Sequence, residues 1–267
     1  MGFLSPLRIR LGLKKPKPIP SFGSDLIDAL LSIRINGTSS YAPPTDIAGF
    51  FRFASRRVTR SHSQLFQDLW ALWSSNNARD GYFVEIGAHD GVDLSNTLLL
   101  ENIGWRGIVA EPNPELATPL RANRRCYICT DAVHSESGLT VDFEITRDST
   151  LSRISDFNPN DHHEHLRQAD HKTVAVKTIS LADLLDQAGA PSFIEFLSID
   201  TEGSEYEILS ALDFSRWRFG SICVEHNYTP ARERIHDLLS RHGYERIQPE
   251  LTLFDDWYIY REDKPCA

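Results

Sequence analysis

The sequence predicts an α/β fold of the Rossmann-like type, with a central, mostly parallel sheet, an antiparallel closing strand and helices on both faces. Two apolar runs support this prediction, because each ends in an acid (Glu85 and Glu111) and the first continues into a glycine turn over residues 87–91. A strand, a glycine turn, a helix, a second strand and a closing acid form a nucleotide-binding α/β unit. The nearly continuous apolar run over residues 193–199 predicts a further strand, buried on both faces.

Local signals predict the other elements in order. Apolar residues at helical spacing predict a helix from Leu65 to Trp73. Asn113 and Pro114 predict the start of another helix, which Pro119 should shorten or kink. A capping box at 204–207 predicts a further helix start. The remaining strands are expected at 82–86, 107–111, 126–129 and 221–225, strand-like segments at 141–146 and 173–178, helices at about 93–102, 181–187 and 229–243, and a closing antiparallel pair at 244–248 and 253–260.

The length of 267 residues suits one α/β domain with an extension. We expect a partly flexible N-terminal extension over residues 1–60 and a catalytic domain over 61–267, with a lid-like insert at about 147–172. The first 20 residues are basic and contain several prolines, which predicts at most a weak contact with a membrane surface.

Composition excludes several classes of protein. A net charge of −9 disfavours a nucleic-acid substrate, because the phosphate backbone would be repelled overall. No apolar run reaches the roughly 20 residues of a membrane span, and the N-terminus has no pattern of a signal peptide. Four cysteines, expected as free thiols, are typical of a reducing compartment, so we expect a cytoplasmic protein. Cys126 and Cys129 form a C-x-x-C, which suggests a redox or zinc pair, but their position in a short strand favours two ordinary thiols.

The glycine turn indicates which cofactor to expect. It lacks the G-x-G-x-x-G pattern of dinucleotide-binding proteins, and Glu85 and Asp90 lie where a pyrophosphate would bind. Carboxylates repel a pyrophosphate, but they tolerate ribose hydroxyls, an amino group and a sulfonium cation. These groups belong to S-adenosylmethionine, so the pattern favours that cofactor and disfavours a nicotinamide oxidoreductase.

Ligands of Rossmann-like folds bind beyond the carboxyl ends of the strands, which selects the expected cofactor-binding residues. Glu111 is placed for the ribose, Glu85 for either the turn or the ammonium group, and Asp131 for the neighbourhood of the adenine. Glycines in the turn allow close approach of the backbone, although turn geometry alone would also explain them. The full set expected to bind cofactor is Glu85, Gly87, Ala88, His89, Gly91, Asn96, Glu111, Pro112, Asp131 and Ala132.

The catalytic residues are expected at the ends of the next two strands, which supply Asp200 with Glu202 and Glu225 with His226. A hydroxyl nucleophile needs either a base that takes its proton or a metal that holds its oxygen, and these side chains offer both routes. A divalent cation is possible but not favoured. The structural alternative for Asp200 and Glu202 is hydrogen bonding to the turn and to the N-terminus of the following helix.

The polar insert contains a second group of potential metal ligands, which runs from Asp161 through His162, His163 and Glu164 to His165. No spacing fixes these ligands on a rigid element, which favours a solvated loop that covers the substrate. We therefore expect the insert to form a lid over the acceptor.

Several of these motifs together resemble the FkbM-type methyltransferases. The resemblance lies in the segments 83–124, 196–205 and 224–227, with a matching opening at 63–68, and it covers roughly residues 61–260. It implies a class I methyltransferase fold, S-adenosylmethionine as cofactor, and a hydroxyl of a sugar, a glycan precursor or a related natural product as acceptor. The oligomeric state stays open. A non-catalytic member that serves as a binding or scaffold module is the alternative, which a lost cofactor acid or a broken glycine turn would favour.

Overall fold

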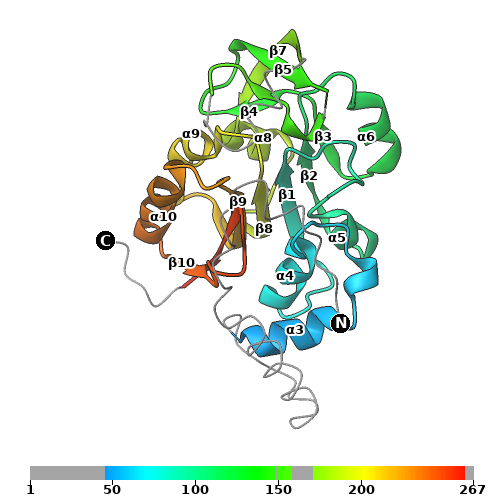
Figure 1. The fold of residues 1–267 in the computed structure, drawn as a ribbon, viewed down its shortest axis with the longest axis vertical. Helices are drawn as coiled ribbons and strands as arrows, with labels where there is room; N and C mark the ends of the chain where they lie inside the picture. Colours follow the sequence, from blue (N-terminus) through cyan, green and yellow to red (C-terminus); the bar gives the residue numbers. More distant parts are fainter. Residues whose placement is uncertain (1–45, 148, 158–170, 262–267) are drawn as a thin grey trace, which may run out of the picture.

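The computed structural model describes residues 46–147, 149–157 and 171–261 (Figure 1). The main sheet consists of β1 (Tyr82–Ile86), β2 (Arg106–Ala110), β3 (Tyr127–Cys129), β8 (Phe193–Ile199), β9 (Arg218–Glu225), β10 (Tyr244–Ile247) and β11 (Asp255–Tyr260). A smaller sheet consists of β4 (Ala132–His134), β5 (Thr140–Thr146), β6 (Arg153–Ile154) and β7 (His171–Ser180). The α-helices are α3 (Ile47–Ser55), α4 (Gln67–Ser74), α5 (Leu98–Asn102), α6 (Ala117–Asn123), α8 (Leu181–Gln187), α9 (Glu205–Ser210) and α10 (Ala231–Arg241), and short 3₁₀ helices span Val58–Arg60 and Ser149–Leu151.

The main sheet has the strand order β10-β11-β9-β8-β1-β2-β3. The neighbours from β9 to β3 are parallel, whereas β11 pairs antiparallel with both β9 and β10. The last described strand, β11, therefore lies between the two strands that precede it in the sequence. The predicted Rossmann-like fold, with its parallel sheet and antiparallel closing pair, is confirmed.

Each face of the main sheet carries its own apolar cluster. Along β1, Tyr82, Val84 and Ile86 join the cluster under α8, α9 and α10, whereas Phe83 joins the cluster under α3, α4, α5 and α6. This separation follows from the alternation of side chains along a strand. Because both clusters are buried, the strand ends are held rigidly, and these ends position the site.

Helix α3 lies before residue 61, where we expected the folded domain to begin. Its N-cap Asp46 accepts a hydrogen bond from the Gly49 amide at 3.0 Å. Phe50 is 3% exposed and contacts Trp70 and Trp257 edge to face, with ring centroids 5.7 and 5.9 Å away. The packed core therefore includes α3, while residues 1–45 lie outside the described part of the chain.

Helix α5 begins at Leu98, later than the expected start near residue 93. The Asp90 carboxylate accepts hydrogen bonds from the amides of Val92 and Asp93, which closes a local turn. Leu94 then adopts a left-handed φ of 59°, which is incompatible with a helix. Side-chain competition for backbone donors thus shortens the helix.

Helix α6 also begins later than expected, at Ala117. The Asn113 side chain accepts from the Glu115 amide at 3.0 Å, so it stabilises a turn instead of capping the helix. Pro119 falls in the first turn of the observed helix, where the absent N–H has no intrahelical partner to lose. At α9, Ser204 is the N-cap, but its side chain makes no capping hydrogen bond, so the expected capping box does not form.

The strand-like segments around residues 141–146 and 173–178 form the smaller sheet, in the order β4-β7-β5-β6. Figure 1 shows this sheet at the top of the view, beside α6. It also contains Ala132, which we assigned to the end of the third strand of the main sheet. The described start of the predicted insert follows β5, whereas the histidine-rich segment 161–165 lies outside the described residues.

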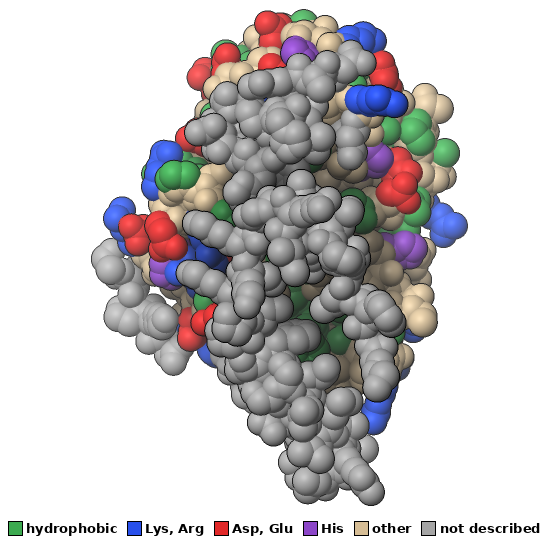
Figure 2. All heavy atoms as spheres, in the orientation of Figure 1, with side chains coloured by type: hydrophobic (Ala, Val, Ile, Leu, Met, Phe, Trp, Pro, Cys, Tyr) green, Lys and Arg blue, Asp and Glu red, His purple; other side chains and the backbone are tan. Residues whose placement is uncertain are grey.

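On the face of the molecule in Figure 2, the visible described side chains are mixed in charge. In Figure 2, the visible acidic and basic side chains alternate around the edge of the face shown. Among the residues that the structure describes, none of the helices combines the length and apolar composition that a membrane crossing requires.

Candidate functional site

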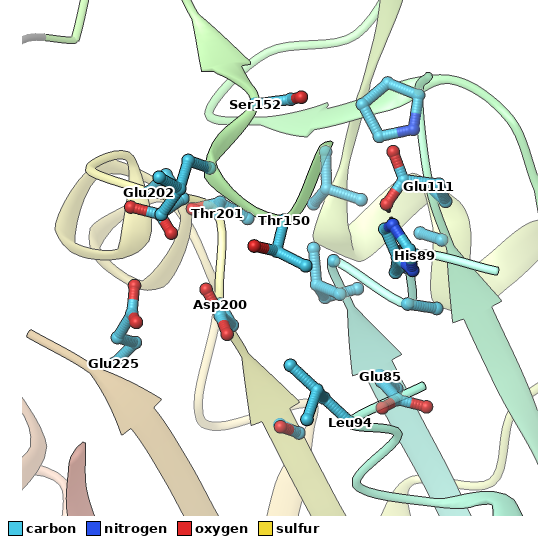
Figure 3. A pocket seen from close by; sticks show the side chains of 18 of the residues that line it. Glu85, His89, Leu94, Glu111, Thr150, Ser152, Asp200, Thr201, Glu202 and Glu225 are labelled. Carbon is cyan, nitrogen blue, oxygen red and sulfur yellow. Dashed lines mark hydrogen bonds between the residues drawn. The ribbon is translucent and has the colours of Figure 1, made fainter. Parts of the chain in front are cut away.

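A cavity of about 350 Å³ lies at the carboxyl ends of β1, β2, β8 and β9. The start of the insert and the small sheet close its other side, so it occupies the position expected for a ligand of this fold (Figure 3). In Figure 3, Asp200, Glu202 and Glu225 lie on one side and Glu111 with His89 on the other. The predicted site residues that line it are Glu85, Gly87, Ala88, His89, Asn96, Glu111, Pro112, Ala132, Asp200, Glu202 and Glu225.

Glu111, at the end of β2, has a carboxylate that backbone amides hold in place. One oxygen accepts from the His89 amide at 3.0 Å, and the other accepts from the Asn113 amide at 2.9 Å. Burial raises the pKa of Glu111 to about 7, although both hydrogen bonds oppose this effect. Because each carboxylate oxygen has two acceptor sites, both retain capacity for a pair of ligand hydroxyls.

Glu85, at the end of β1, is occupied by the protein itself. Its carboxylate accepts from the Asn96 amide at 2.6 Å and from the hydroxyls of Ser95 and Thr97, and it pairs with Arg124 at 3.2 Å. It therefore holds the turn, which is one of its two expected roles. Asn96 lines the cavity, and its buried side-chain carbonyl has no hydrogen-bond partner in the described chain, so it retains the capacity to accept a hydrogen bond.

Packing requires both glycines of the turn. A Cβ on Gly87, at φ 87°, would lie 1.8 Å from the Asp200 carbonyl oxygen. A Cβ on Gly91, at φ 82°, would lie 2.6 Å from Arg124 and 2.8 Å from Leu120. Gly87 thus lets β1 and β8 meet beneath the cavity, whereas Gly91 does not line the cavity.

Asp200, Glu202 and Glu225 form a compact carboxylate group, since one oxygen of each lies within 4.8 Å of the others. Asp200 and Glu225 are hydrogen-bonded to each other. Burial, followed by the surrounding carboxylates, raises the pKa of Asp200 to about 7 and that of Glu225 well above its ordinary value. Near neutral pH the pair therefore retains a proton, which relieves the repulsion between the two carboxyl groups.

The turn after β8 is held by an acid that the sequence reasoning missed. Glu205 accepts from the amides of Thr201 at 2.9 Å and Gly203 at 3.0 Å, and from the Thr201 hydroxyl. It thereby performs the structural role that we considered for Asp200 and Glu202. An acid in the first turn of the predicted helix was the available signal, but we expected the cap at Glu207.

Three predicted site residues do not line this cavity. Besides Gly91, these are Asp131 and His226. The imidazole of His226 is buried, accepts from the Tyr228 amide at 2.9 Å and lies 3.7 Å from Asp256. These contacts hold the ring beside Tyr228 and Asp256, and His226 does not line the cavity.

The C-x-x-C pair shows no sign of activation. Burial raises the pKa of Cys126 to about 12 and also raises that of Cys129. A reactive cysteine needs a lowered thiol pKa, so this direction is the opposite of what a redox pair requires. Cys126 and Cys129 are free thiols.

The insert contributes residues that no sequence signal singled out. Ser149, Thr150, Leu151, Ser152 and Ile154 line the cavity. The Ser149 hydroxyl and the His89 ring nitrogen Nε2 are hydrogen-bonded at 2.7 Å, which joins the insert to the glycine turn. The described start of the insert thus covers part of the cavity, although the sequence could not show which of its residues face inward.

The strand order and the cavity at the carboxyl ends of the strands define a Rossmann-like ligand-binding protein. A family model described as the methyltransferase FkbM domain matches residues 85–246, more than half of the chain, and the chain belongs to this family. No curated protein matches it. Among solved structures, the chain is similar to a precorrin-6y C5,15-methyltransferase from Geobacter metallireducens, with 15% identity, a TM-score of 0.37, and coverage of 72% of this chain and 84% of that chain.

Proposed function

We propose that the protein is an S-adenosylmethionine-dependent O-methyltransferase that acts on a hydroxyl of a sugar, a glycan precursor or a related natural product. The observation that carries this proposal is the hydrogen-bonded pair of Asp200 and Glu225 beside the cavity. With its pKa raised to about 7, Asp200 suits a general base at neutral pH. Membership of the FkbM methyltransferase family supports the reaction class.

The residues of the cavity fit the proposed cofactor. Glu111 retains an acceptor site on each oxygen for the two ribose hydroxyls, and the carbonyl of Asn96 can accept from the ammonium group. Carboxylates along the lining complement a sulfonium cation. Apolar side chains on the small-sheet side suit an adenine ring, and these are Ala132, Val133, Phe143 and Ile154. When bound, this cofactor supplies an electrophilic methyl group.

Asp200 accounts for the proton that methyl transfer releases. The acceptor oxygen forms a bond to the methyl carbon while the carbon–sulfur bond breaks and leaves its electron pair on sulfur. The hydroxyl proton passes to the Asp200 carboxylate. The raised pKa of Glu225 favours its protonated form beside Asp200, which reduces repulsion between two acids in a buried site.

A metal-assisted route is the second possibility, because Asp200, Glu202 and Glu225 could together hold a divalent cation. Carboxylate oxygens are the ligands that Mg²⁺ prefers. A cation there would lower the pKa of the acceptor hydroxyl, so that a weaker base would suffice. We favour direct proton transfer, because the Asp200–Glu225 hydrogen bond already explains how the two acids coexist.

The Asp200→Asn variant tests whether Asp200 acts as a base or metal ligand or only stabilises the fold. We expect the variant to fold and to bind S-adenosylmethionine in calorimetry, while formation of S-adenosylhomocysteine with a hydroxyl acceptor falls by about a hundredfold or more. Asp237→Asn, on the exposed side of α10, is the matched control and should retain activity. Equal activity of the two variants would exclude Asp200 as base, and absence of cofactor binding by the parent protein would overturn the proposed function.

A chelator distinguishes direct proton transfer from metal assistance. We expect full turnover in excess chelator. Loss of activity in chelator that is restored by Mg²⁺ or Mn²⁺ would instead assign the three carboxylates as metal ligands.

A further inference from the structure

The titratable side chains that line the cavity are almost all acids. The described part of the lining contains six carboxylic acids and one imidazole, His89, but no lysine or arginine. The six acids are Glu85, Asp93, Glu111, Asp200, Glu202 and Glu225. Arg124 lies behind the lining, where it pairs with Glu85 at 3.2 Å. It is buried and also pairs with Glu101, so it does not line the cavity.

The acidic character is deepest on the side away from Glu111, where the acceptor would bind. Neither Asp200 nor Glu225 forms an ion pair with a lysine or arginine of the described residues. Behind them lie two further buried acids, Glu205 and Asp255, which raise the pKa of Asp200. Asp255 accepts from the neutral amide of Gln67 at 2.8 Å, so no cation compensates for it at that contact.

From this distribution we infer that the acceptor is uncharged or carries an amino group, and that it bears no phosphate or carboxylate near the methylated hydroxyl. The inference rests on the proposed methyl transfer and specifies its substrate class. Like charges repel strongly in a buried site of low dielectric constant, so an anionic acceptor would be excluded. The hydrogen-bonding inventory agrees, because carboxylates only accept, whereas hydroxyl and ammonium groups donate.

The same chemistry restricts the step at which methylation can occur in a series of enzymatic reactions. A sugar that is attached to a nucleoside diphosphate carries two phosphate groups next to its ring. Such a donor would bring negative charge to an acid-lined cavity. If the acceptor is a sugar, its methylation therefore follows the glycosyl transfer that removes the nucleoside diphosphate, and a glycosyltransferase supplies the substrate.

The test compares matched acceptors that differ only in charge. Full-length protein with S-adenosylmethionine is assayed for S-adenosylhomocysteine with methyl glucoside, methyl glucosaminide, glucose 6-phosphate, glucuronate and uridine diphosphate glucose, and with the corresponding galactose series. Within each series we expect kcat/KM for the neutral or amino member to exceed that of every anionic member by at least tenfold. A phosphorylated or carboxylated member that matches or exceeds its neutral counterpart would overturn the inference.

A binding experiment gives an answer that does not depend on finding the acceptor. Protein saturated with S-adenosylhomocysteine is titrated with 1,3-diaminopropane and with inorganic pyrophosphate. We expect the diamine to bind and the pyrophosphate not to bind, and we expect Asp93→Lys to weaken the diamine more than Asp237→Lys, which changes an exposed acid of α10. Binding of pyrophosphate, or of neither probe, contradicts the inference.

These experiments distinguish failure of the proposed function from failure of the inference about the acceptor. If S-adenosylhomocysteine and S-adenosylmethionine do not bind, the proposed function fails. If they bind and an anionic acceptor is preferred, only the inference about the acceptor fails.

Discussion

Three strand-end acids show how far the environment of a residue determines its role. Glu85 lies near the end of β1, Glu111 follows β2 and Asp200 follows β8, and all three line the cavity. Hydrogen bonds and the Arg124 ion pair occupy Glu85, whereas among the described residues Glu111 accepts hydrogen bonds from two backbone amides. Asp200 instead has another acid, Glu225, as its partner. The same functional group, a carboxylic acid, thus serves as a support, a proposed ligand and a proposed base.

Glu111→Ala tests the proposed contact with the ribose. Loss of hydrogen bonds to a charged acceptor costs roughly 1.5–3 kcal/mol, so we expect affinity for S-adenosylmethionine to fall by one to two orders of magnitude. Isothermal titration calorimetry measures this change. Glu115→Ala is the control, because Glu115 is an exposed acid nearby that pairs with the exposed Lys172. Equal affinities of the two variants would remove Glu111 from the cofactor site.

At the scale of elements, the glycine turn that follows β1 packs closely against the backbone at the end of β8. Both Gly87 and Gly138 have positive φ values, 87° and 82°, but only Gly87 lies against another strand. A Cβ at position 138 would meet nothing within 4 Å. Substitution at the two positions therefore distinguishes the cost of a positive φ from the cost of a steric clash with a neighbouring segment.

We expect Gly87→Ala to destabilise the fold strongly, because the new methyl group would displace the end of β8 that carries Asp200. Gly138→Ala should cost only the roughly 1–2 kcal/mol of a left-handed alanine. Urea unfolding measures both changes. Equal losses would show that conformation alone, without the contact to β8, explains the glycine.

Helix α3 extends the folded unit beyond the start that the motifs suggested. Phe50→Ala should remove the ring that contacts Trp70 and Trp257, with a loss of about 3–5 kcal/mol of unfolding free energy. Phe193→Ala is the control, because Phe193 is 47% exposed, and it should cost much less. Thermal or urea unfolding gives both values. Similar losses for the two variants would show that α3 contributes no more to stability than an exposed side chain.

At the scale of the whole molecule, the buried acids make stability depend on pH. The pKa values of Glu111, Asp200 and Asp255 are all raised to about 7, chiefly by burial. Between about pH 4 and pH 7 the folded state therefore holds protons that the unfolded state releases. Stability falls with rising pH when the folded state binds more protons, so these groups favour the fold at low pH and lose that effect by about pH 7.

We expect the cofactor-free protein to resist urea better at pH 5 than at pH 8, by on the order of a few kcal/mol. Asp255→Asn should flatten this dependence and preserve the Gln67 hydrogen bond, because an amide oxygen can still accept it. Asp237→Asn should leave the slope unchanged. A rise in stability from pH 5 to pH 8 would contradict the raised pKa values.

The sequence by itself determined the alternation of strands and helices, the antiparallel end of the sheet and most of the acids around the cavity. It did so because strand burial produces local apolar runs, and because residues that end parallel strands must meet at one edge of the sheet. Tertiary structure decided which of those residues turn inward. Asp256 and the amide of Tyr228 contact His226, which does not line the cavity. Glu205 accepts hydrogen bonds from the amides of the turn after β8. The packing of Trp70 and Trp257 on Phe50 brings α3 into the core. These outcomes depend on contacts between residues far apart in the chain, whose strength no local pattern records.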